Sequence, residues 1–200
     1  MAITLTISGQ MLDLSEPRAA DIRLGDIARG LCQPRFNGQA WTVGRAATLG
    51  LGDNPPSRPW TILDHSLLVH EIVRVREHPA PARLLHFALL HDAHEAYTGD
   101  VSTPLMRSLS ADAQGELREI QRDIDRAVRK KLNLPDPTAR EEDIIASADE
   151  TALALERNFF LPDHSRWQIG SVSLYDYRRH LLFPPDLPDQ IHAYVKHFST

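Results

Sequence analysis

The chain has very little cysteine, no long hydrophobic run and no excess of positive charge. Cys32 is the single cysteine, so an internal disulfide is impossible and a reducing cytoplasm is the expected location. The apolar sequence around Cys32 favours a small core residue over a nucleophile. No stretch approaches the roughly 18 consecutive apolar residues of a membrane-spanning helix, and residues 1–5 lack the features of a signal peptide. A membrane is therefore not an expected partner.

The balance of charge argues against nucleic acid as a partner. The formal net charge is −5, and no cluster of lysine and arginine is dense enough to follow a phosphate backbone. The 200 residues, of which 42% are hydrophobic and 24% charged, are typical of a single globular domain over 1–200. Ten histidines are more than a chain of this length usually carries, which favours metal chemistry.

The periodicity predicts a mainly α-helical (all-α) domain after a small N-terminal β-hairpin. Residues 3–7 and 11–14 alternate apolar and polar side chains around a glycine turn, as in a hairpin. Helical spacing of apolar residues is found over 21–31, 61–75, 81–97, 112–132, 138–159 and 187–198. Residues 41–59, rich in glycine and proline, are interpreted as a loop in which 41–43 could add a strand, and 163–170 as a second loop.

The predicted helix over 81–97 carries four side chains of metal-ligand type in an apolar setting: His91, Asp92, His94 and Glu95. Polar groups in so apolar a segment cost free energy unless something binds them. On a helix His91 and Glu95 share a face with Asp92 at its edge, and adjacent imidazole and carboxylate groups are ligands for divalent transition metals. A bare His-Asp pair is more often a surface or capped core feature, so support must come from elsewhere in the chain.

Two further residues of ligand type lie on apolar helical runs. His65 is near the start of one predicted helix, and Asp149 is inside another. If three helices pack together, His65, His91, Asp92 and Asp149 can converge in the interior of the bundle. Taken alone, His65 could be a helix-start residue near solvent, and Asp149 could belong to an acidic face with Glu150.

The order His … His-Asp … Asp resembles that of the HD-domain metal-dependent phosphohydrolases, and more closely the bacterial HD-domain 5′-deoxyribonucleotidases. Residues 64–66 look like the first-histidine motif of that family, 90–104 like its central motif, and 148–150 like its last aspartate. The resemblance covers about 35–156 and implies an HD-domain helical bundle. It also implies four metal ligands, which are His65, His91, Asp92 and Asp149.

The same resemblance implies residues that act next to the metal. Glu95 and Asp100 would lie beside it, and Arg35 and Phe36 match the arginine-aromatic pair of the family at the substrate. Asp100 and Thr103 would hydrogen-bond the sugar or phosphate, and Phe36 would pack against the sugar. Residues that would contact the substrate are Arg35, Phe36, Asp92, Asp100, Thr103 and Asp149. The insertion at 41–59 departs from the family pattern and leaves the choice of nucleotide open.

The expected activity is removal of the 5′-phosphate from deoxyribonucleoside monophosphates, with a small-molecule nucleotide as partner. Glu95 would orient or deprotonate the attacking water, assisted by Asp100, and Arg35 would clamp the phosphate. The mixed nitrogen and oxygen ligands suit Mn²⁺, Co²⁺, Zn²⁺ or Fe²⁺. One alternative is a deoxynucleoside triphosphate substrate, with Arg45 or Arg58 as extra cations. Another is a nucleotide-binding module without catalysis. The resemblance also implies a homo-oligomer, a dimer or higher.

Overall fold

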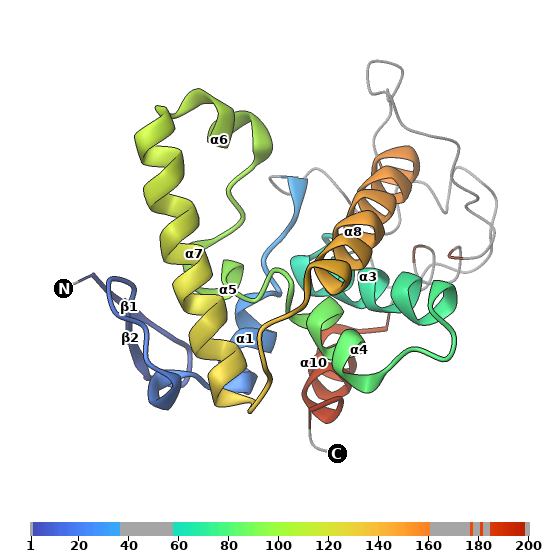
Figure 1. The fold of residues 1–200 in the computed structure, drawn as a ribbon, viewed down its shortest axis with the longest axis horizontal. Helices are drawn as coiled ribbons and strands as arrows, with labels where there is room; N and C mark the ends of the chain where they lie inside the picture. The colour runs from blue at the N-terminus through green and yellow to red at the C-terminus, as the bar shows by residue number, and fades with distance from the viewer. Residues whose placement is uncertain (1, 37–57, 161–176, 178–180, 182–184, 199–200) are drawn as a thin grey trace.

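The computed structural model describes residues 2–36, 58–160, 177, 181 and 185–198. This part of the chain is mostly helical and has a small antiparallel hairpin at its N-terminus, as the sequence predicts (Figure 1). No helix within the described ranges is long and apolar enough to cross a membrane. The predicted loop at 163–170 lies outside the described residues. So does most of the predicted insertion, namely 41–57, with its possible strand at 41–43.

The hairpin is held to the first helix by one buried carboxylate. Strands β1 (Ile3–Leu5) and β2 (Met11–Asp13) pair antiparallel, and α1 (Leu24–Gly30) follows a 3₁₀ turn at Ala19–Asp21. Asp26 of α1 accepts hydrogen bonds from the hydroxyls of Thr6 and Ser8 at 2.7 and 2.6 Å. Because an isolated two-stranded hairpin is only marginally stable, these bonds help to fix it on the helical domain.

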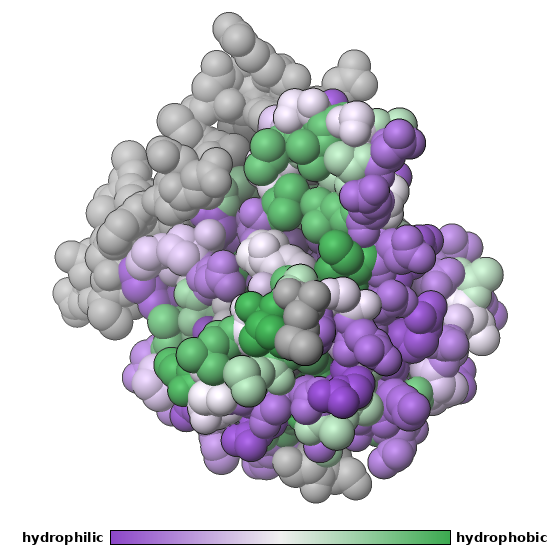
Figure 2. Space-filling model, turned by 90° about the vertical axis from the view of Figure 1, so that its left-hand side faces the viewer, coloured by the Kyte–Doolittle hydropathy of each residue, from purple (hydrophilic) through white to green (hydrophobic). Residues whose placement is uncertain are grey.

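The outer side of the hairpin is apolar and faces solvent. Figure 2 shows this side of the molecule, where apolar patches interrupt a hydrophilic surface. The large exposed side chains of the hairpin are Ile3, Leu5, Ile7 and Met11.

The helix that carries His65 starts with a strong cap. Helix α3 (Ile62–Arg76) begins after Thr61, which forms a reciprocal capping box with Asp64. The predicted span of 61–75 is therefore confirmed to within one residue at each end. Helix α8 (Ala139–Phe160) packs along α3, and it confirms the helix predicted over 138–159.

The single helix predicted over 81–97 is wrong in its second half. Helix α4 (Ala82–Leu90) ends before His91, and a short helix α5 (Glu95–Thr98) follows. Between them the backbone bonds tighten to i→i+3, with Ala93 N–H bonding the Leu90 carbonyl and Glu95 N–H bonding the Asp92 carbonyl. Tight turns of this kind have about three residues per turn, so residues three apart come to lie on one side.

The remaining helices complete the domain. Helix α7 (Ala111–Lys131) confirms the helix predicted over 112–132. Helix α10 (Leu187–Lys196) confirms the one predicted over 187–198, although it ends two residues earlier. Helix α1 is shorter than the predicted 21–31. Helix α6 (Thr103–Ser108) was not predicted, although proline in its first turn is a recognised start signal.

The core consists of two apolar clusters that meet at α3 and α4. The first cluster lies between α3, α4 and α8, and its largest members include Trp60, Leu68, Ile72, Leu155 and Phe159. The second lies between the hairpin, α1, α4, α7 and α10, and includes Leu12, Ile27, Leu89, Ile124 and Tyr194. Cys32 is half-buried against the second cluster, and burial raises the pKa of its thiol, so it lacks the low pKa of a cysteine nucleophile.

One glycine lets α1 approach the turn that follows α4. A Cβ atom on Gly30 would lie 2.7 Å from the carbonyl oxygen of Ala96 in α5, which is too close for any side chain. Gly99, with φ of +77°, then ends α5 in a conformation that suits glycine. Helix α5, which begins with Glu95, therefore packs directly against α1.

Candidate metal centre

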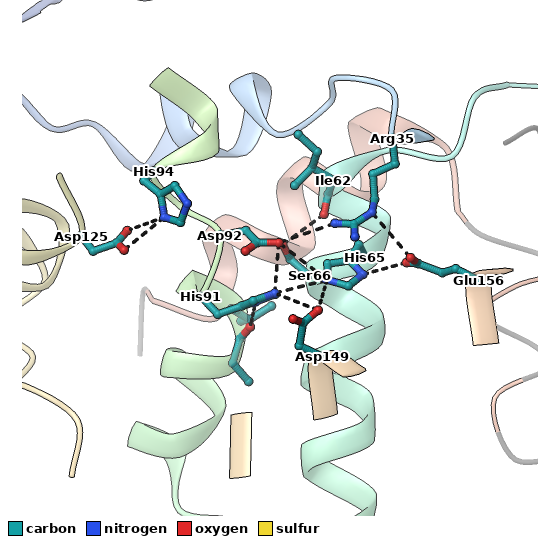
Figure 3. A network of polar contacts seen from close by, with 12 residues as sticks. Arg35, Ile62, His65, Ser66, His91, Asp92, His94, Asp125, Asp149 and Glu156 are labelled. Carbon is teal, nitrogen blue, oxygen red and sulfur yellow. Dashed lines mark hydrogen bonds and ion pairs between the residues drawn. The ribbon is translucent and has the colours of Figure 1, made fainter. Parts of the chain in front are cut away.

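Three helices bring the four proposed ligands together in the interior (Figure 3). His65 lies in the first turn of α3, His91 caps the end of α4, and Asp92 follows it. Asp149 comes from the middle of α8. The sequence placed these residues on separate apolar helices, and the structure shows that the helices pack with the four side chains facing one another.

The two histidines point the same ring nitrogen at each other. His65 Nδ1 lies 2.8 Å from Glu156 Oε1, and His91 Nδ1 lies 2.9 Å from the carbonyl oxygen of Ala88. A carboxylate and a carbonyl can only accept, so each Nδ1 carries the proton in the neutral tautomer. If both rings were neutral, the two Nε2 atoms would be lone-pair acceptors only 3.2 Å apart, so the pair needs either a proton on one Nε2 or a cation between them.

The carboxylates complete the cluster. Asp92 Oδ2 lies 3.1 Å from His91 Nε2 and 3.6 Å from His65 Nε2, and Asp149 Oδ1 lies 2.9 Å from His65 Nε2. The ligand atoms of His65, His91 and Asp92 all lie within 4.8 Å of one another and could hold a metal ion. Asp149 is the most accessible of the four, because its side chain is 42% exposed.

The electrostatics of the cluster favour positive charge at the imidazoles. Burial alone would lower the pKa of His91, but Asp92 and Asp149 outweigh it and raise the pKa to about 9. Burial would raise the pKa of Asp92, but His91, His65 and Arg35 lower it well below the usual range. The same field that attracts a proton attracts a metal cation, and the donor set of two imidazoles and two carboxylates suits a divalent transition metal.

Glu95 stands next to Asp92 rather than His91. Because the turn after α4 is tight, Asp92 and Glu95, three residues apart, share one side. Their ligand atoms, with those of His94, form a second group within 4.8 Å that could also bind metal. The structure therefore groups Glu95 with Asp92 and His94, and His91 is also near enough to act on the pKa of Glu95, so Glu95 lies beside the cluster.

Glu95 is in an unusual state for a carboxyl group. Its Oε2 atom is buried and has no hydrogen-bond partner. Burial, together with the negative charges of Asp92 and Asp100, raises its pKa to about 9. A carboxyl group that is pushed toward the neutral form next to a metal-ligand cluster is a candidate for acid-base chemistry.

Arg35 reaches the cluster from the segment after α1. Its Nη1 lies 3.6 Å from Asp92 Oδ2 and its Nε 3.5 Å from Glu156 Oε2, and both contacts are longer than good hydrogen bonds. Its Nε is buried without a hydrogen-bond partner. The Phe36 ring centroid lies 5.6 Å from the guanidinium carbon, within cation–π range. Phe36 has φ of +52°, which is rare for a bulky residue.

The other predicted site residues lie farther from the cluster. Asp100 is exposed but close enough to raise the pKa of Glu95. Thr103 is exposed at the start of α6. Arg58, one of two extra cations considered for a triphosphate, instead binds both oxygens of Asp64 at 2.6 and 2.7 Å. Arg45, the other, lies outside the described residues.

Sequence reasoning missed two residues that support the cluster. Glu156 is fully buried and binds His65, while Asp125 of α7 holds His94 Nδ1 through both oxygens at 3.1 and 3.2 Å. A signal for Glu156 exists, because Asp149 and Glu156 are seven residues apart and so lie on one face of α8. No local pattern pairs His94 with Asp125, which lies 31 positions later.

A cavity of about 250 Å³ opens beside the cluster, between α4, α7 and α8. His91 and Asp149 line it on the side of the metal centre. Apolar side chains, among them Phe87, Val128 and Ile145, line much of the rest. A small molecule in this cavity would touch the cluster and an apolar wall at once.

Comparisons with known proteins do not show a family for this chain. No protein-family model matches the chain. The chain is similar to an uncharacterized protein of Rhodobacter capsulatus, with 36% identity over 104 residues that make up 52% of this chain and 46% of the relative, about half its length. It is also similar to the uncharacterized protein YfdR of Escherichia coli, with 28% identity over 171 residues, or 84% of this chain and 79% of YfdR. Neither name states an activity.

Proposed function

We propose that the chain is a metal-dependent phosphohydrolase of the HD-domain type, which removes the 5′-phosphate from deoxyribonucleoside monophosphates. The observation that carries this proposal is the pair of facing Nε2 atoms of His65 and His91, 3.2 Å apart and flanked by Asp92 and Asp149. Imidazoles and carboxylates this close attract a proton or a metal cation, and the order of these residues resembles that of the family, which supports the metal.

A divalent metal held by these four residues would supply Lewis acidity and a coordinated water of lowered pKa. The residues around it fit the remaining tasks. The Arg35 guanidinium is planar and charged, which suits it to bind a phosphate. Its contacts to Asp92 and Glu156 are long, so a bound phosphate could replace them. Glu95 would orient a water or, once a bound cation lowers its pKa, accept a proton, and the exposed Asp100 acts on it as a nearby charge.

The geometry favours a monophosphate over a triphosphate. A triphosphate needs several cations. In the described part of the chain Arg35 contacts the cluster, whereas Arg58 is bound to Asp64, and Arg129, which lines the cavity beside the cluster, is paired with Asp136. A nucleotide-binding module without catalysis is disfavoured because Glu95, buried without a hydrogen-bond partner for its Oε2, would then be costly and without use. The cytoplasmic location and the homo-oligomer stay predictions. The exposed apolar side chains of the hairpin are one surface through which two copies of the chain could associate.

Phosphate release from a panel of nucleotides tests the proposal. Metal-free protein is supplied in turn with Mn²⁺, Co²⁺, Zn²⁺ and Fe²⁺ and is given deoxyribo- and ribonucleoside 5′-monophosphates and the matching triphosphates. We expect release from deoxyribonucleoside monophosphates that depends on metal. Release from triphosphates alone would show that the substrate is a deoxynucleoside triphosphate and not a monophosphate. No release with any metal, despite bound metal, would favour the binding module.

Metal content tests the site itself. His91→Ala and Asp149→Ala should each lose metal relative to wild type, because each removes one of four ligands. His192→Ala is the matched control, since His192 is an exposed histidine on α10 outside the cluster. Metal content equal to wild type in both ligand variants would overturn the proposed site.

A further inference from the structure

The cavity beside the metal centre continues along helix α8, away from the proposed ligands. Asp149 lines it at the cluster, and Glu142 lines it at the other end of the same helix face. The two residues are seven positions apart, which corresponds to about two turns of helix, or roughly 10 Å. A ligand in this cavity could therefore contact the metal centre with one group and lie near Glu142 with another.

The walls between these two carboxylates are apolar. Val128 of α7 belongs to the second apolar cluster of the core, Ile145 of α8 packs against the first, and Phe87 of α4 adds an aromatic ring. The volume of about 250 Å³ is below the roughly 300–1,000 Å³ of sites for drug-sized ligands, so the cavity suits a single ring system. A flat ring between these walls would lose apolar surface to water, which is favourable.

Glu142 differs from the other charged residues that line the cavity. Asp125 is bound to His94, Arg129 donates to Asp136 at 3.0 and 3.1 Å, and the other two belong to the proposed metal site. Glu142 is exposed, and within the described part of the chain no hydrogen bond or ion pair engages its carboxylate. Both of its oxygens are therefore accessible acceptors at the end of an apolar cavity, where they favour a ligand that carries N–H donors.

We infer that this cavity binds the base of the nucleotide and that Glu142 gives a preference for guanine. The inference rests on the proposed function, because it takes the ligand to be a deoxyribonucleoside monophosphate with its phosphate at the metal centre. In an extended nucleotide the base edge lies about as far from the 5′-phosphate as Glu142 lies from Asp149, roughly 10 Å along the helix. The apolar walls would then enclose the faces of the base.

The preference for guanine follows from the donors on each base. Guanine has two neighbouring donors, N1–H and the exocyclic amino group, which match the two oxygens of a carboxylate. Thymine has one N–H between two carbonyl oxygens, and these oxygens would repel the carboxylate. Adenine and cytosine each have an amino group beside an acceptor nitrogen, so they should bind with intermediate affinity.

Binding of free deoxynucleosides to the full chain loaded with Mn²⁺ tests the inference. Deoxyguanosine, deoxyadenosine, deoxycytidine and thymidine carry no phosphate, so their affinities, measured by calorimetric titration, do not depend on hydrolysis. We expect deoxyguanosine to bind most tightly and thymidine most weakly. Glu142→Gln should weaken deoxyguanosine binding at least tenfold, because the amide replaces one acceptor with a donor, and it should leave thymidine binding no weaker.

Asp143→Asn is the matched control for charge. Asp143 is exposed, follows Glu142 on α8 and is not among the residues that line this cavity, so its replacement should leave the order of the four affinities unchanged. Ala146→Leu tests the location, because Ala146 is exposed and lines the cavity, and a larger side chain would fill it. This variant should weaken binding of all four deoxynucleosides, whereas Ala139→Leu, at an exposed position near the start of the same helix, should not.

The results separate this inference from the proposed function. Equal affinities for the four deoxynucleosides, an unchanged preference in Glu142→Gln, unweakened binding in Ala146→Leu or no binding at all would each overturn the inference. Phosphate release from monophosphates would still support the phosphohydrolase in any of these cases. Conversely, a preference for deoxyguanosine that is lost in Glu142→Gln, together with no phosphate release by wild type, would support the base site and contradict the proposed activity.

Discussion

His65 and Glu156 form a fully buried pair, with His65 Nδ1 2.8 Å from Glu156 Oε1, although they are 91 positions apart in the chain. The same oxygen accepts the indole N–H of Trp60 at 2.9 Å, and the other oxygen lies 3.5 Å from Arg35 Nε. One carboxylate from α8 therefore orients a proposed metal ligand and faces the proposed phosphate-binding arginine. Carboxylates in this position fix the tautomer of a ligating histidine and raise its basicity.

Replacing Glu156 should therefore weaken metal binding without removing a ligand. We expect Glu156→Gln to lower metal affinity roughly ten- to a hundredfold, since glutamine cannot supply the negative charge that holds His65. Competition with a chromophoric chelator measures this affinity. Glu150→Gln, an exposed glutamate one residue after Asp149, is the control and should behave as wild type. Unchanged affinity in Glu156→Gln would mean that the pair serves packing alone.

Arg35→Lys tests the geometry of the proposed phosphate clamp. Lysine keeps the charge but loses the planar fork and the packing of the guanidinium over Phe36, so phosphate release should fall by at least tenfold. Steady-state rates at saturating metal measure this loss. Arg118→Lys on the exposed face of α7 should leave the rate unchanged. Equal rates in Arg35→Lys and wild type would assign Arg35 a structural role at Asp92 and Glu156.

The position of the site could be predicted because its residues conflict with their surroundings. His65, His91 and Asp149 have side chains that bind metals, but they lie in apolar helical segments. Such a polar residue in an apolar segment can be recognised from the sequence alone. The helices themselves follow from apolar spacing and from strong signals such as the Thr61 and Asp64 capping box. For this reason the sequence predicts the hairpin and helices α3, α7 and α8 with bounds close to the observed ones.

What could not be predicted depends on contacts that are distant in sequence. Residues 91–94 include no glycine or proline, so nothing local signals the break after α4, where tight turns set Glu95 beside Asp92. The spacing from Asp149 puts Glu156 on the same face of α8, but a charged residue on a helix is usually exposed, so its burial is not apparent in the sequence. Only the packing of α8 on α3 shows that it is buried against His65.

His70 should make stability depend on pH in the acidic range. Burial, and to a smaller extent the charges of His197, Arg74 and His86, lower the pKa of His70 from 6.5 to about 4. The negative charge of Glu71 opposes this shift. Between these values the unfolded chain binds a proton that the folded chain does not, so the free energy of unfolding falls as pH drops from about 6.5 to about 4. A difference of about 2.5 pKa units corresponds to about 3 kcal/mol at most.

Urea unfolding at several pH values measures the contribution of His70. In His70→Phe the free energy of unfolding should fall less steeply over the same pH range, because phenylalanine does not titrate. His192→Phe, at an exposed position on α10, is the control and should keep the wild-type slope. A slope in His70→Phe identical to that of wild type would show that His70 takes up its proton over the same pH range in the folded and unfolded states.

Glu95→Gln separates the chemistry of the centre from its assembly. Burial and the charges of Asp92 and Asp100 raise the pKa of Glu95 from 4.5 to about 9, so in metal-free protein the folded state keeps a proton that the unfolded state releases between these values. The contribution of Glu95 to stability is therefore largest at low pH and is lost as pH rises. Glutamine resembles the protonated form, so the metal-free variant should gain stability relative to wild type as pH rises toward about 9.

The activity of the same variant decides the role of Glu95. If Glu95 accepts a proton from water or orients it, Glu95→Gln should bind metal and nucleotide as wild type does, while phosphate release falls roughly a hundred- to ten-thousandfold. Glu95 also belongs, with Asp92 and His94, to the second group of ligand atoms within 4.8 Å, so it could instead hold metal. In that case metal affinity would fall and excess metal would restore the rate. Metal titration and rate measurements on one preparation distinguish the two roles, because only loss of the proton acceptor leaves a slow enzyme that is fully loaded with metal.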